Sequence, residues 1–268
     1  MKKTLFYILL IIAGLFCSYR PALAGNPSGV SNTSEREITT QERLVGEFSR
    51  LSSAGSTPIT YIQSNISKVV IEGNPEHISK MITEVRGGTL YIEMQKGSYR
   101  NLNLHVTVFS PVLDEVSMSG SGSFHDKNGH KTNGDIRYSS AGSGKFNIGR
   151  IECASFDAHL AGSGTLSVEY LMCSGNASLS TSGSGGLTVQ KMVSKGDVSL
   201  RLSGSGYGLL DDVEIGDLKI HISGSGSVKV NGLARDVSAS ISGSGSVMGN
   251  LEFRHLNAHT SGSGSVRL

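Results

Sequence analysis

The sequence contains no tryptophan, and only 17% of its 268 residues are charged. Its one long apolar run, Leu5 to Phe16, is too short to span a membrane comfortably, and no other segment comes close. Basic residues outnumber acidic ones by only 24 to 22, and they form no basic stripe. This near-neutral balance argues against nucleic acid as a partner.

The N-terminal residues have the pattern of a targeting segment. Lys2 and Lys3 precede the apolar run, and Ala22-Leu23-Ala24 matches the small-x-small pattern of a signal-peptidase site. We therefore predict a signal peptide over residues 1–24 and an exported protein, either periplasmic or at the cell surface or secreted. Cleavage would leave 21 basic and 22 acidic residues and no transmembrane segment. Residues 25–45 are polar and aperiodic, which predicts a flexible leader.

Glycine is abundant, with 35 copies, and much of it lies in eight Gly-Ser-Gly triplets. Successive triplets start 19 to 22 residues apart, and self-similarity at such a period is typical of stacked repeats. A flexible Gly/Ser linker is the alternative, but the glycines keep a period and apolar residues alternate between them, which favours a folded solenoid. The triplet glycines are Gly120, Gly122, Gly142, Gly144, Gly162, Gly164, Gly183, Gly185, Gly204, Gly206, Gly224, Gly226, Gly243, Gly245, Gly262 and Gly264.

Apolar residues occupy alternate positions around each triplet, as Val237, Ala239 and Ile241 do before Gly243. Such period-2 alternation predicts a half-buried strand on each side of a glycine corner, and it leaves no room for helices. Strands one period apart would then pair in parallel and in register. We predict an all-β fold, a right-handed parallel β-helix (β-solenoid) with about 20 residues per coil.

This β-solenoid should extend over residues 46–268, with a less regular N-terminal β region at 46–110 and repeat coils at 111–268. The triplet glycines share parity with the inward columns, so the wall should bend inward there and have no room for a Cβ. The central serines, from Ser121 to Ser263, should then form an outward ladder. The polar stretch from His125 to Asp135 is expected to be a longer loop.

These features resemble a known family. The stretch Pro111 to Gly122 reads Pro-x-Leu-x-x-Val-x-x-Ser-Gly-Ser-Gly, and repeated Ser-Gly-Ser-Gly-Ser corners follow it. Together with the signal peptide and the irregular N-terminal third, they resemble the head GIN domain of putative auto-transporter adhesins, which is common in Bacteroidetes. The resemblance covers roughly residues 46–268. It implies a right-handed β-helix in an exported protein, and it brings no catalytic residues to carry over.

Two of the three cysteines, Cys153 and Cys173, would remain after signal cleavage. Each lies eleven positions after the first glycine of a triplet, so they should stack on adjacent coils. Neighbouring strands are about 4.8 Å apart, which is within the Cα range of a disulfide, and an oxidising compartment would permit the bond. The alternative is two small apolar thiols in one core column. The third cysteine, Cys17, would allow lipidation, but Phe16 is a poor residue immediately before a lipidated cysteine.

No catalytic, cofactor or metal site is legible in the sequence. Polysaccharide-cleaving β-helices need clustered carboxylates, whereas the acidic residues Asp157, Asp197, Asp217 and Asp236 are one or more coils apart or occupy a second corner, and the doublet Asp211-Asp212 fits a solvated turn. His159, His221 and His259 share an outward column but are not on adjacent coils, as ligands of one metal ion would be. We therefore predict no enzyme activity, no cofactor and no metal.

The leading hypothesis is a non-enzymatic exported adhesin or an envelope- or glycan-binding surface module. Its partner is unknown, with envelope or host polysaccharide or protein as candidates. The second hypothesis is a structural or self-assembling envelope protein. The sequence stops at Leu268 just after a triplet, and open β-helix ends would allow a homo-oligomer. A carbohydrate-active enzyme is the third.

Overall fold

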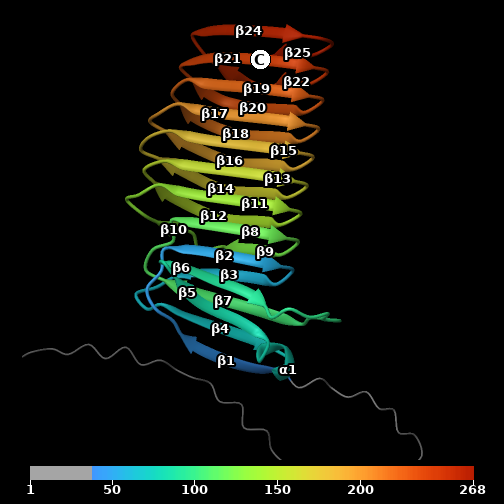
Figure 1. Ribbon diagram of the computed structural model, residues 1–268. Coiled ribbons are helices and arrows are strands. Elements are labelled where there is room, and N and C mark those ends of the chain that lie inside the picture. Colours follow the sequence, from blue (N-terminus) through green and yellow to red (C-terminus); the bar gives the residue numbers. More distant parts are fainter. Residues whose placement is uncertain (1–37) are drawn as a thin grey trace, which may run out of the picture. The chain divides into compact units, whose positions relative to one another are not determined.

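The computed structural model describes residues 38–268, which form two long sheets and one short helix. The predicted signal peptide (residues 1–24) and most of the predicted leader lie outside the described residues. The first sheet has 14 strands, and the second has 11. Figure 1 shows their coils stacked one upon another from β8 to β24. This stack confirms the predicted β-solenoid, with about 21 residues per coil and about 7 turns.

We call the 14-stranded sheet the long-strand sheet. It contains β1 (Thr39–Leu44), β3 (Pro58–Gln63), β4 (Lys68–Gly73), β7 (Leu104–Ser110), β9 (Ser123–Asp126), β10 (His130–Lys131), β12 (Lys145–Cys153), β14 (Thr165–Cys173), β16 (Gly186–Ser194), β18 (Tyr207–Ile215), β20 (Ser227–Ala234), β22 (Ser246–Met248), β23 (Leu251–Glu252) and β25 (Ser265–Arg267).

We call the 11-stranded sheet the serine sheet. It contains β2 (Arg50–Gly55), β5 (Met81–Arg86), β6 (Thr89–Met94), β8 (Glu115–Gly120), β11 (Ile136–Gly142), β13 (Phe156–Gly162), β15 (Ala177–Gly183), β17 (Val198–Gly204), β19 (Leu218–Gly224), β21 (Asp236–Gly243) and β24 (His255–Ser261). The single helix, α1 (Pro75–Ile78), begins after an Asn74 cap whose side chain accepts a hydrogen bond from the Glu76 N–H.

From β8 onward every pairing within a sheet is parallel and joins equivalent residues of successive coils. In the serine sheet, Val198 pairs with Leu218 and Leu218 with Val237, which continues the column that the alternating pattern predicts. These three side chains are at most 3% exposed. Because each coil has one apolar side only, stacking is what buries it, and the columns form one continuous core.

The triplets lie at the corner where each serine-sheet strand passes into a long-strand-sheet strand. At Gly204 the backbone has φ of +113°, and a Cβ there would lie 2.5 Å from the carbonyl oxygen of Gly183 on the preceding coil. A Cβ at Gly206 would lie 2.6 Å from the carbonyl oxygen of Gly185. Corners therefore stack this closely only because both positions lack a side chain.

The N-terminal region is less regular, as predicted, because several of its strands pair out of chain order. β4 pairs antiparallel with both β1 and β7, and β5 pairs antiparallel with β6. One expectation is corrected here: residues 39–44, assigned to the flexible leader, form strand β1. Its backbone hydrogen bonds go to β4, so a polar and aperiodic stretch is held by edge pairing rather than by burial.

Candidate functional site

The most regular surface of the molecule is an array of serines along the triplet corners. The central serine is exposed in all eight triplets. On the serine sheet, a second column of exposed serines precedes the first glycine of the later triplets. It comprises Ser182, Ser203, Ser223, Ser242 and Ser261, which pair in register from coil to coil. We call these five and the neighbouring Ser184, Ser205, Ser225, Ser244 and Ser263 the double serine ladder.

The ladder offers hydroxyl groups at the strand spacing of about 4.8 Å. Each hydroxyl can donate one hydrogen bond and accept others, so the surface is chemically uniform along the stack. At the other end of the serine sheet, Ser117 and Ser139 hydrogen-bond to each other at 2.7 Å between their Oγ atoms. The arrangement suits contact with a repetitive polar partner better than capture of one small molecule.

The second corner carries a column of acidic residues on successive coils. Asp197, Asp217 and Asp236 each come one residue before, or at the start of, a serine-sheet strand. The Asp197 Oδ1 accepts the backbone N–H of Asp217 at 3.1 Å, and the Asp217 Oδ1 accepts Arg235 Nε at 2.7 Å. The Asp236 carboxylate lies 2.8 Å from His255 Nδ1.

These aspartates lie one coil apart at the second corner, as the sequence suggested, and each has a structural partner. The Arg235 hydrogen bond lowers the pKa of Asp217, and the same bond raises the pKa of Arg235. Glycoside hydrolysis needs a carboxyl group whose pKa is raised so that it can donate a proton. Asp217 is shifted in the opposite direction, so its geometry fits an ion pair between coils.

The other acidic candidates also form ion pairs or hydrogen bonds on the surface. Asp157 faces Arg137 at 3.4 Å on the adjacent coil. Asp211 and Asp212 lie where the register of β18 shifts against β20, and Asp212 has a positive φ of 46°. Asp212 pairs with Lys191 at 2.6 Å, and Asp211 accepts a hydrogen bond from Asn231 at 2.7 Å.

The histidine column is spread along the stack rather than gathered. His159 lies 2.9 Å from the hydroxyl of Ser180 on the next coil, and Arg201 follows in the same column before His221. His259 is aligned with Ser240. Within residues 38–268 there is no group of three or more His, Cys, Asp or Glu side chains placed to hold a metal ion.

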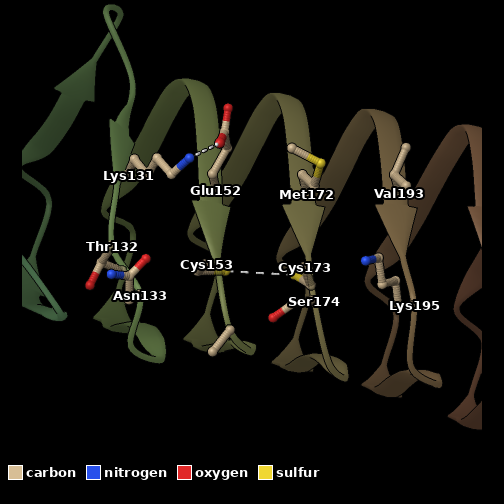
Figure 2. Close-up of a pocket in the computed structure, with 11 residues that line it drawn as sticks. Lys131, Thr132, Asn133, Glu152, Cys153, Met172, Cys173, Ser174, Val193 and Lys195 are labelled. Carbon is tan, nitrogen blue, oxygen red and sulfur yellow. Dashed lines mark hydrogen bonds and ion pairs between the residues drawn. The ribbon is translucent and has the colours of Figure 1, made fainter.

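A small pocket of about 260 Å³ opens where the long-strand sheet turns toward the serine sheet. Figure 2 shows Cys153 and Cys173 side by side at its base, on adjacent coils, with the ion-paired Lys131 and Glu152 on one side and Lys195 on the other. The two cysteines pair in register, and their Sγ atoms are 3.6 Å apart and unbonded. We call this cavity the thiol pocket.

A buried acid–base pair is the feature that the sequence reasoning missed. Asp126 and His130 have fully buried side chains, with Oδ2 and Nδ1 2.5 Å apart. The His130 ring packs edge-on against Tyr61. The stretch was interpreted as a polar loop, but Asp126 has inward parity, two residues after the core residue Phe124, and it aligns with the buried Ile148. That parity was the available signal.

Three buried polar atoms around this pair have no hydrogen-bond partner in the protein: Asp126 Oδ1, His130 Nε2 and the Tyr138 hydroxyl. Burial, with the nearby Asp126 charge as a smaller cause, raises the pKa of Tyr138 well above its ordinary value. Burial also raises the pKa of Tyr61 to about 12. The cluster thus places neutral phenols around the pair, inside an aromatic core formed with Phe124, Phe146 and Phe156.

These observations define a parallel β-solenoid whose most repetitive feature is its outer surface. The family model described as putative auto-transporter adhesin, head GIN domain, matches residues 47–178 and 170–268. The chain therefore belongs to that family, whose function is unknown, and the resemblance seen in the sequence is confirmed. No match is found among the curated proteins.

Solved structures from Bacteroidetes have the same fold. A putative adhesin from Parabacteroides distasonis is 18% identical with a TM-score of 0.79, over 87% of this chain and 97% of that one. A putative adhesin from Bacteroides fragilis is 20% identical with a TM-score of 0.69, over 87% and 97%. A protein from P. distasonis described as a putative lipid binding protein is 25% identical with a TM-score of 0.77, over 87% and 97%.

The described part of the chain has no helix long and apolar enough to cross a bilayer.

Proposed function

We propose that this protein is a non-enzymatic, exported binding module that presents the double serine ladder to a repetitive polar polymer, with envelope or host polysaccharide as the preferred class. The main support for this proposal is the register of the ladder, which repeats the same hydroxyl positions on five successive coils. A polymer with a regular repeat can form the same weak contact many times, and linked weak contacts add up to useful avidity. The family description as an adhesin is consistent with export and surface binding.

Binding of a lipid inside the solenoid is less well supported. One relative of 25% identity is described as a putative lipid binding protein. In the described chain, however, core residues such as Leu200, Ile222 and Val230 are fully buried against one another and fill the interior. The thiol pocket, at about 260 Å³, is smaller than the 300–1,000 Å³ typical of ligand sites.

The test is binding of the purified exported chain to a panel of immobilised envelope and host polysaccharides. The variant carries Ser205→Glu and Ser244→Glu, two exposed ladder positions on non-adjacent coils. A control, Gln190→Glu with Lys229→Gln, makes the same change in net charge on the outer face of the long-strand sheet. We expect binding to fall at least tenfold in the ladder variant, since two of the five ladder coils then present a carboxylate in place of a hydroxyl, and to stay unchanged in the control.

Three results would count against this function. Absence of binding to every polysaccharide would reject the partner class, and equal loss in both variants would reject the ladder as the contact surface. Turnover of a polysaccharide that an Asp197→Asn variant abolishes would reject the non-enzymatic part. Fatty acids and lipid vesicles are included in the panel, so lipid binding would be seen directly.

A second candidate function, self-association, is favoured by the last coil. Every residue of β24 is exposed, and this strand is at the edge of the serine sheet. Leu256 is 41% exposed, whereas Val237 at the same position of the preceding coil is 3% exposed. Open edges of this kind can pair with another strand. Sedimentation velocity should show concentration-dependent association that Leu256→Lys abolishes, and a strictly monomeric chain at high concentration would contradict it.

A further inference from the structure

The thiol pocket contains two nucleophilic groups to which the proposed binding function gives no role. Cys153 and Cys173 end β12 and β14, and they are the cysteines of the described region. Both are buried, at 7% and 1% exposure. The next residue in their column is Ser194, whose hydroxyl donates to the Gly175 carbonyl at 2.7 Å. Sulfur therefore faces sulfur only between these two coils.

We propose that Cys153 and Cys173 are a modification site, at which a disulfide bond covalently joins two adjacent coils of the solenoid. The inference rests on the proposed export, because an oxidising compartment is where such a bond persists. The geometry supports it in two ways. The two residues are direct partners in a parallel pairing, where Cα atoms are about 4.8 Å apart, inside the range that disulfides span.

The sulfur atoms need only a small movement. They are 3.6 Å apart as thiols and must approach to about 2.05 Å. Rotation about the Cα–Cβ bonds moves the sulfurs without shifting the strands, and the pocket beside them leaves space for that rotation. Larger side chains at these positions would have packed the column tightly and removed this freedom.

The chemistry balances with a disulfide of a dithiol oxidoreductase, or with oxidised glutathione, as the oxidant. One cysteine thiolate attacks the oxidant's disulfide and forms a mixed disulfide, which releases one thiol. The second cysteine then attacks its neighbour's sulfur, so that the S–S bond closes and the second thiol leaves. The chain loses two protons and two electrons, and the oxidant gains them.

Access to the pair is restricted, which determines how the bond forms. Contact with the Cys173 thiol, together with burial, raises the pKa of Cys153 above its ordinary value. Because the thiolate is the reactive species, the folded and reduced protein should react slowly with an oxidant of any size. The thiol pocket gives a small oxidant a route to Cys153, while a bulky enzyme would act before the coils have closed.

The position of the bond explains what it would stabilise. On its N-terminal side, β12 pairs with β9 only over Lys145 to Ile148 and with β10 only at Ile151 and Glu152. On the other side, β12 pairs with β14 as far as Cys153. The end of β12 is thus held on its N-terminal side by only two residue pairs with β10, and a disulfide there would hold it to the next coil.

The test compares the full chain exported to an oxidising compartment with the same chain purified reduced and treated with oxidised glutathione. Each sample is unfolded without reductant and treated with a maleimide, and its mass is measured. We expect no labelled thiol at Cys153 or Cys173 in either sample. We also expect reduction to lower the thermal midpoint by roughly 5–10 °C. The control, Cys153→Ala with Cys173→Ala, should not respond to reductant.

The exported sample and the glutathione-treated sample together distinguish failure of this proposal from failure of the proposed function. Two labelled thiols in the exported chain, or a stable mixed disulfide with glutathione in place of the closed bond, would overturn the inference. If the chain fails to be exported, cell fractionation shows it, and the glutathione arm still decides whether the pair can close. A Cys173→Ser variant that traps glutathione on Cys153 would support the order of steps, whereas a Cys153 that carries no glutathione and is fully labelled by the maleimide in that variant would contradict access through the pocket.

Discussion

At the scale of single residues, the corner glycines carry the strongest structural demand. Gly204 combines a positive φ of +113° with a carbonyl oxygen of the preceding coil that a Cβ would meet at 2.5 Å. No rotamer relieves this contact, because both partners are backbone. Ser205, one residue later, is exposed and has its hydroxyl in solvent. The same corner therefore contains one position that tolerates no side chain and one that tolerates many.

We predict that Gly204→Ala destabilises the protein by about 1–3 kcal/mol or more, because it adds left-handed strain to a backbone clash. Ser205→Ala is the matched control and should stay within about 0.5 kcal/mol of the parent, as expected for a surface change. Urea unfolding followed by circular dichroism measures both. Equal stability of the two variants would show that the corner can widen at little cost.

At the scale of elements, the Asp126–His130 pair ties the end of β9 to β10 across the excursion that interrupts the first coil. The sequence predicted a longer loop here, and the structure instead has two core residues and a short strand within it. The reason is that a His and an Asp can be buried together when they hydrogen-bond to each other, as Nδ1 and Oδ2 do here. A pattern that treats all charged residues as exposed cannot anticipate this.

Removal of one partner should be more harmful than removal of both. We expect His130→Phe to cost about 3–5 kcal/mol, since it leaves the Asp126 carboxylate buried without its partner. The double change Asp126→Leu with His130→Phe should recover most of that loss, because no charge remains in the core. Thermal unfolding of the parent, of Asp126→Leu, of His130→Phe and of the double variant forms a complete double-mutant cycle. Additive losses would mean that the two side chains act independently.

At the scale of the whole molecule, the stack behaves as a chain of nearest-neighbour interfaces. Column partners are 19 to 21 residues apart, and their register is continuous from β11 to β24. Stability in such an array is approximately the sum of coil and interface contributions. Loss of one whole coil should therefore shorten the stack without disturbing the remaining coils.

We predict that deletion of residues 177–197, one complete coil, gives a folded and shorter solenoid. The deletion brings Val198 to the place of Ala177, its partner in the same column, so every inward residue keeps its parity. Deletion of residues 177–187, which removes about half a coil, should give an aggregated or unfolded chain. Circular dichroism, gel filtration and thermal unfolding distinguish these outcomes. Two folded products would contradict a register set by the inward columns.

The sequence by itself determined the repeat, the alternation and therefore the solenoid. Period-2 columns and a glycine corner every 20 residues or so leave few other ways to bury the apolar side of each coil. It also predicted the outward serines, since Ser205 and its counterparts follow from parity alone. The family resemblance depended on the same residues.

Only the tertiary structure decided what depends on contacts between distant or unequal segments. The antiparallel pairing of β1 with β4 joins two stretches of unrelated pattern, and it assigns residues 39–44 to the fold. Burial of Asp126 with His130, and the 3.6 Å approach of the two thiols, depend on side-chain directions that spacing cannot specify. Repetition specifies the average coil, because each coil meets the same neighbours. The exceptions arise where that repetition breaks, and there the local packing decides.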